Sequence, residues 1–338
     1  MAELLLEILA EEIPAGVLPQ ARKDLLRGLA DALAAERIQG TFFTHSTSRR
    51  LVLFSRDLPE AQEDHEVEAV GPSIKVAFDA EGRPTRAAEG FARGQGVAVE
   101  ALRVVSTPKG EYVSVKKVVE GRLTSEILAE AIPAVVSKMT FPRMMRWGDG
   151  RHNWIRPVHS VVCLFDGLVV PFTLFGVETA RTTHGHRTLA PARIVVTGID
   201  DYLAKLRSAF VEPDYAVRRR TLAEKAGVLA AEVGCTAVED AALVDALAHL
   251  VEWPGLVRGS FDPAYLELPE EILVTAMREH QKVLPTRDAA GALAPHFFAV
   301  SDHAGDPEGH IVRGNEWVLN ARFADARFFW DDDGKAPL

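Results

Sequence analysis

The chain has 338 residues, of which 47% are hydrophobic and 25% charged, and its 48 acidic side chains outnumber 38 basic ones for a net charge of −10. This composition is that of a folded globular protein and excludes a mainly disordered chain. Two cysteines without a Cys-x-x-Cys pair provide neither a disulfide framework nor the usual zinc site. No apolar run approaches the roughly 20 residues that cross a bilayer, and the N-terminus lacks the basic region of a signal peptide. We therefore expect a cytoplasmic protein of two or three domains without a membrane partner.

The acidic charge is concentrated in one part of the chain. Residues 229–338 hold 19 acidic and 8 basic side chains, whereas the residues before them hold 29 and 30. Within residues 138–187, seven basic side chains accompany only three acidic ones and four histidines. Salt screens charges that are more than about 8–10 Å apart, so a local basic patch can attract a nucleic acid although the whole chain is acidic. The shift in charge also indicates a domain boundary near residues 200–228.

Hydrophobic periodicity predicts a mixed first half with antiparallel hairpins. Residues 4–9 form a buried strand in this interpretation, and the leucines that follow Pro14 recur at helical spacing. Residues 59–86 are polar and are interrupted by Gly71-Pro72, so they are predicted to form mainly loop and little helix or strand. The other elements expected are strands at 41–44, 50–54, 102–106, 112–119, 158–165, 168–175 and 194–196, and helices at 15–36, 87–93 and 123–139.

The remainder is expected to be mostly helical. The pattern predicts helices at 200–209, 215–233, 240–251, 269–282 and 315–330, and a strand pair at 283–286 and 296–301. The last helix carries Leu319, Phe323, Ala326 and Trp330 on one stripe and ends in Asp331-Asp332-Asp333. Acids at a helix C-terminus oppose the helix dipole, which suggests a longer helix, a basic partner or a chain cut within a domain. The predicted class is α+β, with residues 1–198 forming one α+β domain or two subdomains and residues 199–338 a mostly helical domain that is truncated at its C-terminus.

Two arginine-rich segments have the chemistry of a nucleic-acid surface. Ser46-Thr47-Ser48-Arg49-Arg50 combines hydroxyl and guanidinium donors that suit phosphate, although a solvated hairpin turn has the same composition. Residues 141–150 place Arg143 and Arg146 among methionines and a tryptophan. Guanidinium groups bind phosphate and aromatic rings stack on bases, but a solvated face over an ordinary core is the competing interpretation.

The segment Arg181-Thr-Thr-His-Gly-His-Arg187 is the third candidate. His184 and His186 lie two residues apart, as two metal ligands on a strand would, but no third ligand is evident nearby and we predict no metal site. A donor-rich loop for phosphate or a 2′-hydroxyl fits better, with Gly185 allowing close approach. Neither a phosphate-binding loop nor a dinucleotide fingerprint nor a nucleophile elbow is present, so nothing in the chain builds an ATP site.

At these segments the sequence resembles the beta subunit of the bacterial-type, two-subunit glycyl-tRNA synthetases. The resemblance runs in order along essentially the whole chain. The matching segments are residues 4–14, Ser48-Arg-Arg-Leu51, Thr85-Arg-Ala-Ala-Glu-Gly-Phe-Ala-Arg93, residues 107–112, Met145-Arg-Trp-Gly-Asp149, residues 155–159, Arg181-Thr-Thr-His-Gly-His-Arg187, residues 250–254, Met277-Arg-Glu-His-Gln-Lys282 and residues 324–329.

The resemblance implies a tetramer of two alpha and two beta subunits that joins glycine to tRNA(Gly) with ATP and Mg²⁺. It places the adenylate-forming site on the alpha subunit, so that this chain binds no cofactor of its own and has no catalytic residue, and it gives the beta subunit tRNA binding and assembly. Family beta subunits are longer and carry an anticodon-binding module, so the chain is expected to be an N-terminal fragment without activity by itself. The chemistry of the residues and the family resemblance together predict a surface that binds tRNA or the alpha subunit. Its candidate residues are Arg49, Arg50, Arg143, Arg146, Arg181, His184, His186 and Arg187.

Two other functions are compatible with the sequence. Residues 138–187 could serve only to dock the alpha subunit, which would be a structural role. A small editing-like hydrolase that uses His184 and His186 is the third option, for which no nucleophile is identifiable.

Overall fold

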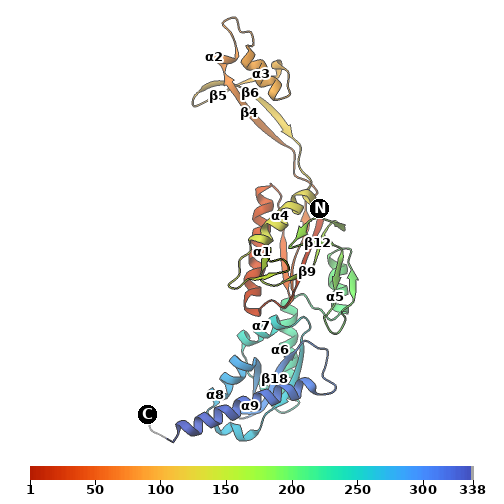
Figure 1. The fold of residues 1–338 in the computed structure, drawn as a ribbon, viewed down its shortest axis with the longest axis vertical. Coiled ribbons are helices and arrows are strands. Elements are labelled where there is room, and N and C mark those ends of the chain that lie inside the picture. Colours follow the sequence, from red (N-terminus) through yellow and green to blue (C-terminus); the bar gives the residue numbers. More distant parts are fainter. Residues whose placement is uncertain (336–338) are drawn as a thin grey trace.

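The computed structural model describes residues 1–335, which form three units in a row (Figure 1). The body comprises residues 1–64 and 120–211, the arm residues 65–119, and the C-terminal unit residues 212–335. The arm projects from one end of the body, and the C-terminal unit lies at the other. Over these residues no helix has the length and apolar character needed to cross a membrane.

The body is a seven-stranded sheet between helices. Its main strand order is β11-β12-β9-β1-β3-β2, with β10 paired to β9. Helices α1 and α4 cover one face and α5 the other. The strands are β1 (Ala2–Ala10), β2 (Phe42–Ser46), β3 (Arg50–Leu58), β9 (Val158–Phe165), β10 (Leu168–Val169), β11 (Thr173–Leu174) and β12 (Val177–Ala180), and the helices are α1 (Leu18–Ala35), α4 (Thr124–Lys138) and α5 (Ile199–Ser208). Two small hairpins, β7–β8 (Met145–Trp147, His152–Trp154) and β13–β14 (Thr182–His184, Arg193–Val195), complete it.

Strand β1 is buried on both faces because helices lie on both sides of the sheet. Successive side chains of a strand point to opposite faces. Leu4, Leu6 and Ile8 pack with α1 and α4, whereas Leu5 packs with α5. Glu7 therefore points into the α5 side, and it is fully buried. A carboxylate in such a place needs a partner.

The arm is a thin, separate unit. It contains β4 (His65–Ser73), β5 (Arg103–Thr107) and β6 (Gly110–Val119) in the order β4-β6-β5, with α2 (Ile74–Ala77) and α3 (Arg86–Gly94). Its hydrophobic cluster is small, with Ala77, Ala88 and Val113 buried and Phe78, Phe91 and Leu102 packed against them. Strands β4 and β6 continue toward the body as a narrow ribbon (Figure 1).

The C-terminal unit has helices on both faces of a four-stranded sheet of order β15-β17-β18-β16. One face packs against α6 and α7, and the other against α8, the π-helix that follows it, and α9. The bounds are β15 (Thr236–Ala237), β16 (Gly255–Ser260), β17 (Val283–Arg287), β18 (Leu293–Ser301), α6 (Tyr215–Ala231), α7 (Ala241–Leu250), α8 (Glu270–Thr275), the π-helix Ala276–Gln281 and α9 (His310–Asp333).

The α+β class is confirmed, and so are most of the predicted elements. The Asp166-Gly167 hairpin has positive φ at both residues (49° and 73°), as a tight two-residue turn requires. The prediction of a loop at residues 59–86 is wrong for residues His65–Ser73, which form strand β4. That strand lies in a thin sheet with much of both faces in solvent, so it lacks the apolar alternation by which strands are recognised.

Two further expectations need correction. The hydrophobic pattern predicts neither β15 nor β16 of the C-terminal unit. The last helix begins at His310 rather than 315, and Trp330 is 49% exposed although Leu319 and Phe323 of the same stripe are buried. Helix α5, which begins at the proposed boundary, packs on the body sheet. The predicted domain boundary, which separates residues 1–198 from residues 199–338, stays a prediction about which parts of the chain fold independently.

We predict that the body and the C-terminal unit fold without the arm. Asp64 and Glu120 flank the paired residues His65 and Val119, and the base is fixed by the backbone hydrogen bond from Gln62 N to the carbonyl of Arg122 (2.9 Å). Replacing residues 65–119 by an Asn-Gly turn should therefore not lower the free energy of unfolding of the rest and can raise it by up to about 3 kcal/mol, because each halving of the loop that must close saves about 0.6 kcal/mol. Urea unfolding measures this, and a loss of several kcal/mol would show that the arm belongs to the body's core.

Candidate functional site

Arg50 lies buried where the body meets the C-terminal unit. Its side chain is 0% exposed, and it points to the same side of the sheet as Glu7. All five N–H donors of the guanidinium group have acceptors. These are Glu252 Oε1 (2.8 Å), Glu7 Oε2 (2.9 Å), the Thr183 hydroxyl (2.9 Å), and the backbone carbonyls of His184 (2.8 Å) and Gly185 (3.3 Å).

The two carboxylates beside Arg50 come from different units. Glu7 is on β1 and also accepts hydrogen bonds from the Tyr202 hydroxyl (2.6 Å) and from Thr183. Glu252 follows α7 in the C-terminal unit and accepts from the Thr47 hydroxyl (2.6 Å) of the body. Burial disfavours the charged guanidinium, but Glu252 and Glu7 outweigh it and raise the pKa of Arg50. Arg50 thus ties the C-terminal unit to the body.

Arg218 makes a second buried link. It is on α6, is 0% exposed, and donates to the carbonyls of Ala248 (2.9 Å) and Glu212 (2.5 Å) in its own unit and of Ser46 (2.6 Å) in the body. Burial lowers its pKa to about 10, although Glu252 and Glu212 favour the charged form. Arg50 and Arg218 together balance the buried charges of Glu7 and Glu252.

His186 is a junction residue and not a surface donor. It is 3% exposed, and its Nε2 lies 3.1 Å from Asp302 Oδ2 at the end of β18. Its Nδ1 accepts from the backbone N–H groups of Thr188 (3.3 Å) and Leu189 (3.2 Å), which assigns the proton to Nε2, facing Asp302. The other oxygen of Asp302 accepts from the backbone of Glu252 (2.8 Å), so the same carboxylate joins both units.

Three of the expected residues do lie together on the surface. Arg49, His184 and Arg187 line a pocket of about 240 Å³ with His159. The side chain of Arg49 forms no ion pair within residues 1–335, and its Nε is buried without a partner. Burial, followed by the nearby charges of Arg193 and Arg50, lowers the pKa of His184, so this imidazole is neutral at pH 7.

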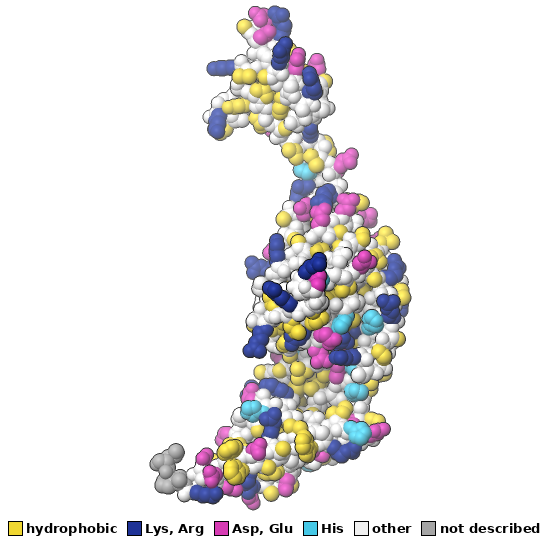
Figure 2. Space-filling view, in the orientation of Figure 1, with side chains coloured by type: hydrophobic (Ala, Val, Ile, Leu, Met, Phe, Trp, Pro, Cys, Tyr) yellow, Lys and Arg dark blue, Asp and Glu magenta, His cyan; other side chains and the backbone are white. Residues whose placement is uncertain are grey.

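Acidic side chains border this pocket. His159 Nε2 lies 2.9 Å from Glu11 Oε1, and that hydrogen bond lowers the pKa of Glu11. Arg187 reaches Glu12 at 3.2 Å and Glu11 at 3.6 Å. The face of the molecule that Figure 2 shows carries Lys and Arg side chains interspersed with Asp and Glu side chains. The pocket is therefore nearly balanced in charge, apart from Arg49.

Arg143 and Arg146 lie on or beside the β7–β8 hairpin. Both are exposed, and neither forms an ion pair or a side-chain hydrogen bond in the part of the chain that the structure describes. The hairpin adjoins the pocket through Arg156, which approaches Met145 Sδ (3.3 Å) and donates to the carbonyl of Glu12 (2.8 Å). Arg181 is half-buried and donates to the Gly167 carbonyl (3.4 Å).

The eight expected residues thus separate into two groups. Arg50 and His186 are buried in the junction and cannot contact a partner at the surface. For Arg50, neither interpretation of its segment, the phosphate-binding turn or the solvated turn, is correct, because Glu7 and Glu252 hold its side chain inside. The other six are accessible at least in part. The sequence interpretation missed Glu7, Arg218 and Glu252; the one available signal was a glutamate within the apolar run Leu4-Leu-Leu-Glu-Ile-Leu9.

A metal pair at His184 and His186 has no support from the geometry. His184 lines the surface pocket, whereas His186 contacts Asp302. Over residues 1–335 no group of three or more His, Cys, Asp or Glu side chains could hold a metal ion.

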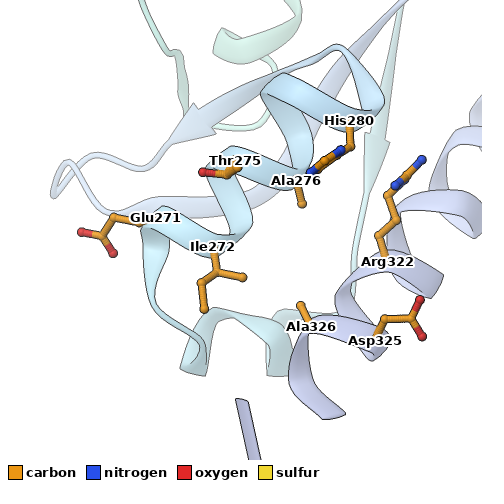
Figure 3. A pocket seen from close by; sticks show the side chains of 8 residues that line it. All are labelled: Glu271, Ile272, Thr275, Ala276, His280, Arg322, Asp325 and Ala326. Atoms are coloured by element: carbon orange, nitrogen blue, oxygen red, sulfur yellow. The ribbon is translucent and has the colours of Figure 1, made fainter. Parts of the chain in front are cut away.

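A second cavity, of about 530 Å³, lies in the C-terminal unit between α8, the π-helix and α9 (Figure 3). Ile272 and Ala326 face it from opposite helices, and His280 and Arg322 lie at one end. It contains side chains of both signs, including Glu271 and Asp325. None of the eight expected residues reaches it.

Comparisons with known proteins identify relatives along the whole chain. The family model described as glycyl-tRNA synthetase beta subunit matches residues 4–338. The glycine–tRNA ligase beta subunit of Trichlorobacter lovleyi is 43% identical over 337 residues, which cover 99% of this chain and 49% of that protein. The corresponding subunits of Syntrophotalea carbinolica and Syntrophus aciditrophicus are 43% and 40% identical, covering 100% and 99% of this chain. The chain spans about half the length (49%) of these curated relatives.

We predict that Arg50→Met destabilises the protein by about 3–5 kcal/mol, because it leaves two buried carboxylates without their cation. Arg49→Met, at the neighbouring half-buried position without an ion pair, is the matched control and should cost about 0.5 kcal/mol or less. Urea unfolding followed by circular dichroism measures both. Equal effects of the two substitutions would contradict the assigned role of Arg50.

We also predict that acid weakens the junction through His249. This imidazole stacks on Tyr215 at 4.2 Å, and burial, then Arg218 and Arg22, lower its pKa to about 4. Because the unfolded chain binds this proton near pH 6.5 and the folded chain binds it only near pH 4, stability is full above pH 6.5 and falls by about 3 kcal/mol as the pH drops to 4. His249→Gln should lose this part of the pH dependence. If the wild-type protein and His249→Gln lose the same unfolding free energy between pH 7 and pH 4.5, the assigned role of His249 is wrong.

Proposed function

The chain belongs to the glycyl-tRNA synthetase beta-subunit family, and from that membership we propose that it forms the part of a glycine–tRNA ligase that binds tRNA and assembles with the alpha subunit. In this proposal the complete enzyme joins glycine to tRNA(Gly) in the cytoplasm. ATP and Mg²⁺ are used on the alpha subunit, and the chain described here does not form the adenylate. The fragment alone is expected to be inactive.

The observation that carries tRNA binding is the pair Arg143 and Arg146. An exposed arginine on a folded protein commonly has a carboxylate nearby, and many arginines of this chain do, such as Arg151 with Asp149 (2.7 Å). The two hairpin arginines have no such neighbour in ion-pair range within residues 1–335. Their donors are free to bind phosphate oxygens without first breaking an internal pair.

The adjoining pocket supports the same function in a different way. Arg49 is a cation that is partly removed from water and lacks a partner, so an incoming anion would gain a contact without competition. Gly185 also lines the pocket, but a Cβ atom there would collide with the carbonyl oxygen of Ala190 and with Ala209, so packing inside the protein explains this glycine. An RNA phosphate is an anion of suitable size and charge for this position.

Assembly is the second candidate function, and a specific observation favours it. The ion pairs of Arg187 with Glu11 and Glu12, and of His159 with Glu11, give the pocket rim both signs of charge. Mixed charge is typical of protein interfaces, whereas an RNA-binding surface is more uniformly positive. We therefore propose the hairpin and the neighbouring Arg49 for tRNA, and the mixed-charge rim of the pocket, where Arg187 and His159 pair with glutamates, for the alpha subunit. The editing-like alternative gains no support, since His184 and His186 diverge.

We predict that Arg143→Ala with Arg146→Ala weakens tRNA binding by the complete enzyme and makes it less sensitive to salt. If each arginine neutralises one phosphate, the slope of log affinity against log salt should fall by about 0.9 per residue. Arg220→Ala on α6 is the control, because that exposed side chain lies 3.9 Å from Glu224 and should leave the slope unchanged. Fluorescence anisotropy with labelled tRNA, at several salt concentrations, measures the slope.

Copurification with the alpha subunit distinguishes the two candidate functions. An unchanged salt slope together with a lost alpha subunit would assign the hairpin to assembly. An unchanged slope with intact assembly would remove both arginines from either role.

A further inference from the structure

The outer face of helix α3 on the arm has a composition that the fold does not explain. The buried side of this helix is formed by Ala88 and Ala92. Arg86, Gly90 and Arg93 lie at helical spacings of four and three on the opposite side, and all three are exposed. The two arginine Cα atoms are about 10 Å apart, since seven residues rise about 1.5 Å each.

Gly90 is the informative residue of this face. Glycine inside a helix is less favourable than alanine because the unfolded chain loses more conformational freedom. A Cβ atom at Gly90 would meet nothing within 4 Å, so no packing contact within the protein requires its absence. Its φ is not positive either, which removes the conformational reason for glycine. Open space at Cβ is shared by Gly227 of α6, but at Gly90 the bare backbone lies between two exposed arginines and leaves room for the close approach of something outside the chain.

The charges of the face indicate what approaches. Within residues 1–335, neither Arg86 nor Arg93 forms an ion pair, although Glu89 is exposed on the same side of the helix, three residues after Arg86 and four before Arg93. Lys and Arg side chains project from several sides of the arm (Figure 2). Two free guanidinium groups about two helical turns apart suit a pair of anionic groups on one strand.

A protein partner fits this face poorly. Interfaces between proteins depend on buried aromatic or aliphatic anchors, and the outer side of α3 offers only Ala87 and Glu89 beside the arginines and glycines. The phosphodiester backbone of a nucleic acid needs cations and close contact instead, and half or more of its hydrogen bonds go to phosphate and sugar.

We propose that the outer face of α3 binds the phosphodiester backbone of an RNA, with Arg86 and Arg93 on two phosphates and the backbone near Gly90 in contact with the strand between them. The face is distinct from the β7–β8 hairpin, because the arm extends away from the body on its ribbon (Figure 1). The identity of the RNA as tRNA rests on the proposed function, but the contact itself does not depend on Arg143 or Arg146.

Substitution of Gly90 by alanine separates binding from folding. Gly90→Ala should strengthen α3, raising the hydrogen-exchange protection of its amides about three- to fivefold, because alanine is the better helix former. The same methyl group should lower tRNA affinity of the complete enzyme about tenfold, because it holds the strand away. A purely structural glycine would not give these opposite signs. Gly227→Ala on α6 is the matched control, since Gly227 is also helical with open space at Cβ and should leave tRNA affinity unchanged.

The paired variant Arg86→Ala with Arg93→Ala should reduce the salt slope of tRNA binding by about 0.9 per arginine. Unchanged affinity in both the glycine and the arginine variants would overturn the proposal. Loss in the arginine variant alone would overturn close contact at Gly90, and loss of the alpha subunit with intact tRNA binding would show a protein occupant instead. Because the hairpin variants are measured separately, failure of one site leaves the result for the other intact.

Discussion

The arrangement of the molecule depends on the buried guanidinium of Arg50. It is held by one carboxylate from the body and one from the C-terminal unit, and a body threonine contacts each of them. Buried ion pairs contribute little net stability compared with apolar packing, but they are costly to break and strict in geometry. Their effect here is to fix one orientation of the two units, which places the exposed arginines of the body in a constant frame relative to the C-terminal unit.

The accessible cations divide according to whether the chain itself neutralises them. Arg187 and His159 have acidic neighbours at the pocket rim, so a partner there must exchange one ion pair for another. Arg143 and Arg146 on the hairpin, and the arginines of α3, have none in the described chain. A strongly acidic protein can thus present free positive charge at two separated places, one on the body and one at the end of a projecting arm. Total charge says little about this, because screening makes each surface act locally.

Much of the fold could be predicted from local pattern. The apolar run of β1, the leucine spacing of α1 and the Asp166-Gly167 turn are signals contained in a few consecutive residues. The arm strand β4 was not predictable in this way, because a strand exposed on much of both faces has no alternation. Arg49 lines the surface pocket whereas Arg50 is buried in the junction, and this difference depends on residues far away in the sequence. Consecutive residues point to opposite sides at the start of β3, and only the fold brings Glu252, some 200 positions away, to one of them.

Native-state hydrogen exchange tests the central claim most directly, namely that the Arg50 network makes the body and the C-terminal unit one cooperative structure. Slow amides of β1 in the body and of β18 in the C-terminal unit lie on either side of the junction. The account predicts that, at low denaturant, both sets exchange with the same opening free energy, because the units cannot separate without exposing buried charge. Exchange of β18 at an opening free energy several kcal/mol below that of β1 would contradict it.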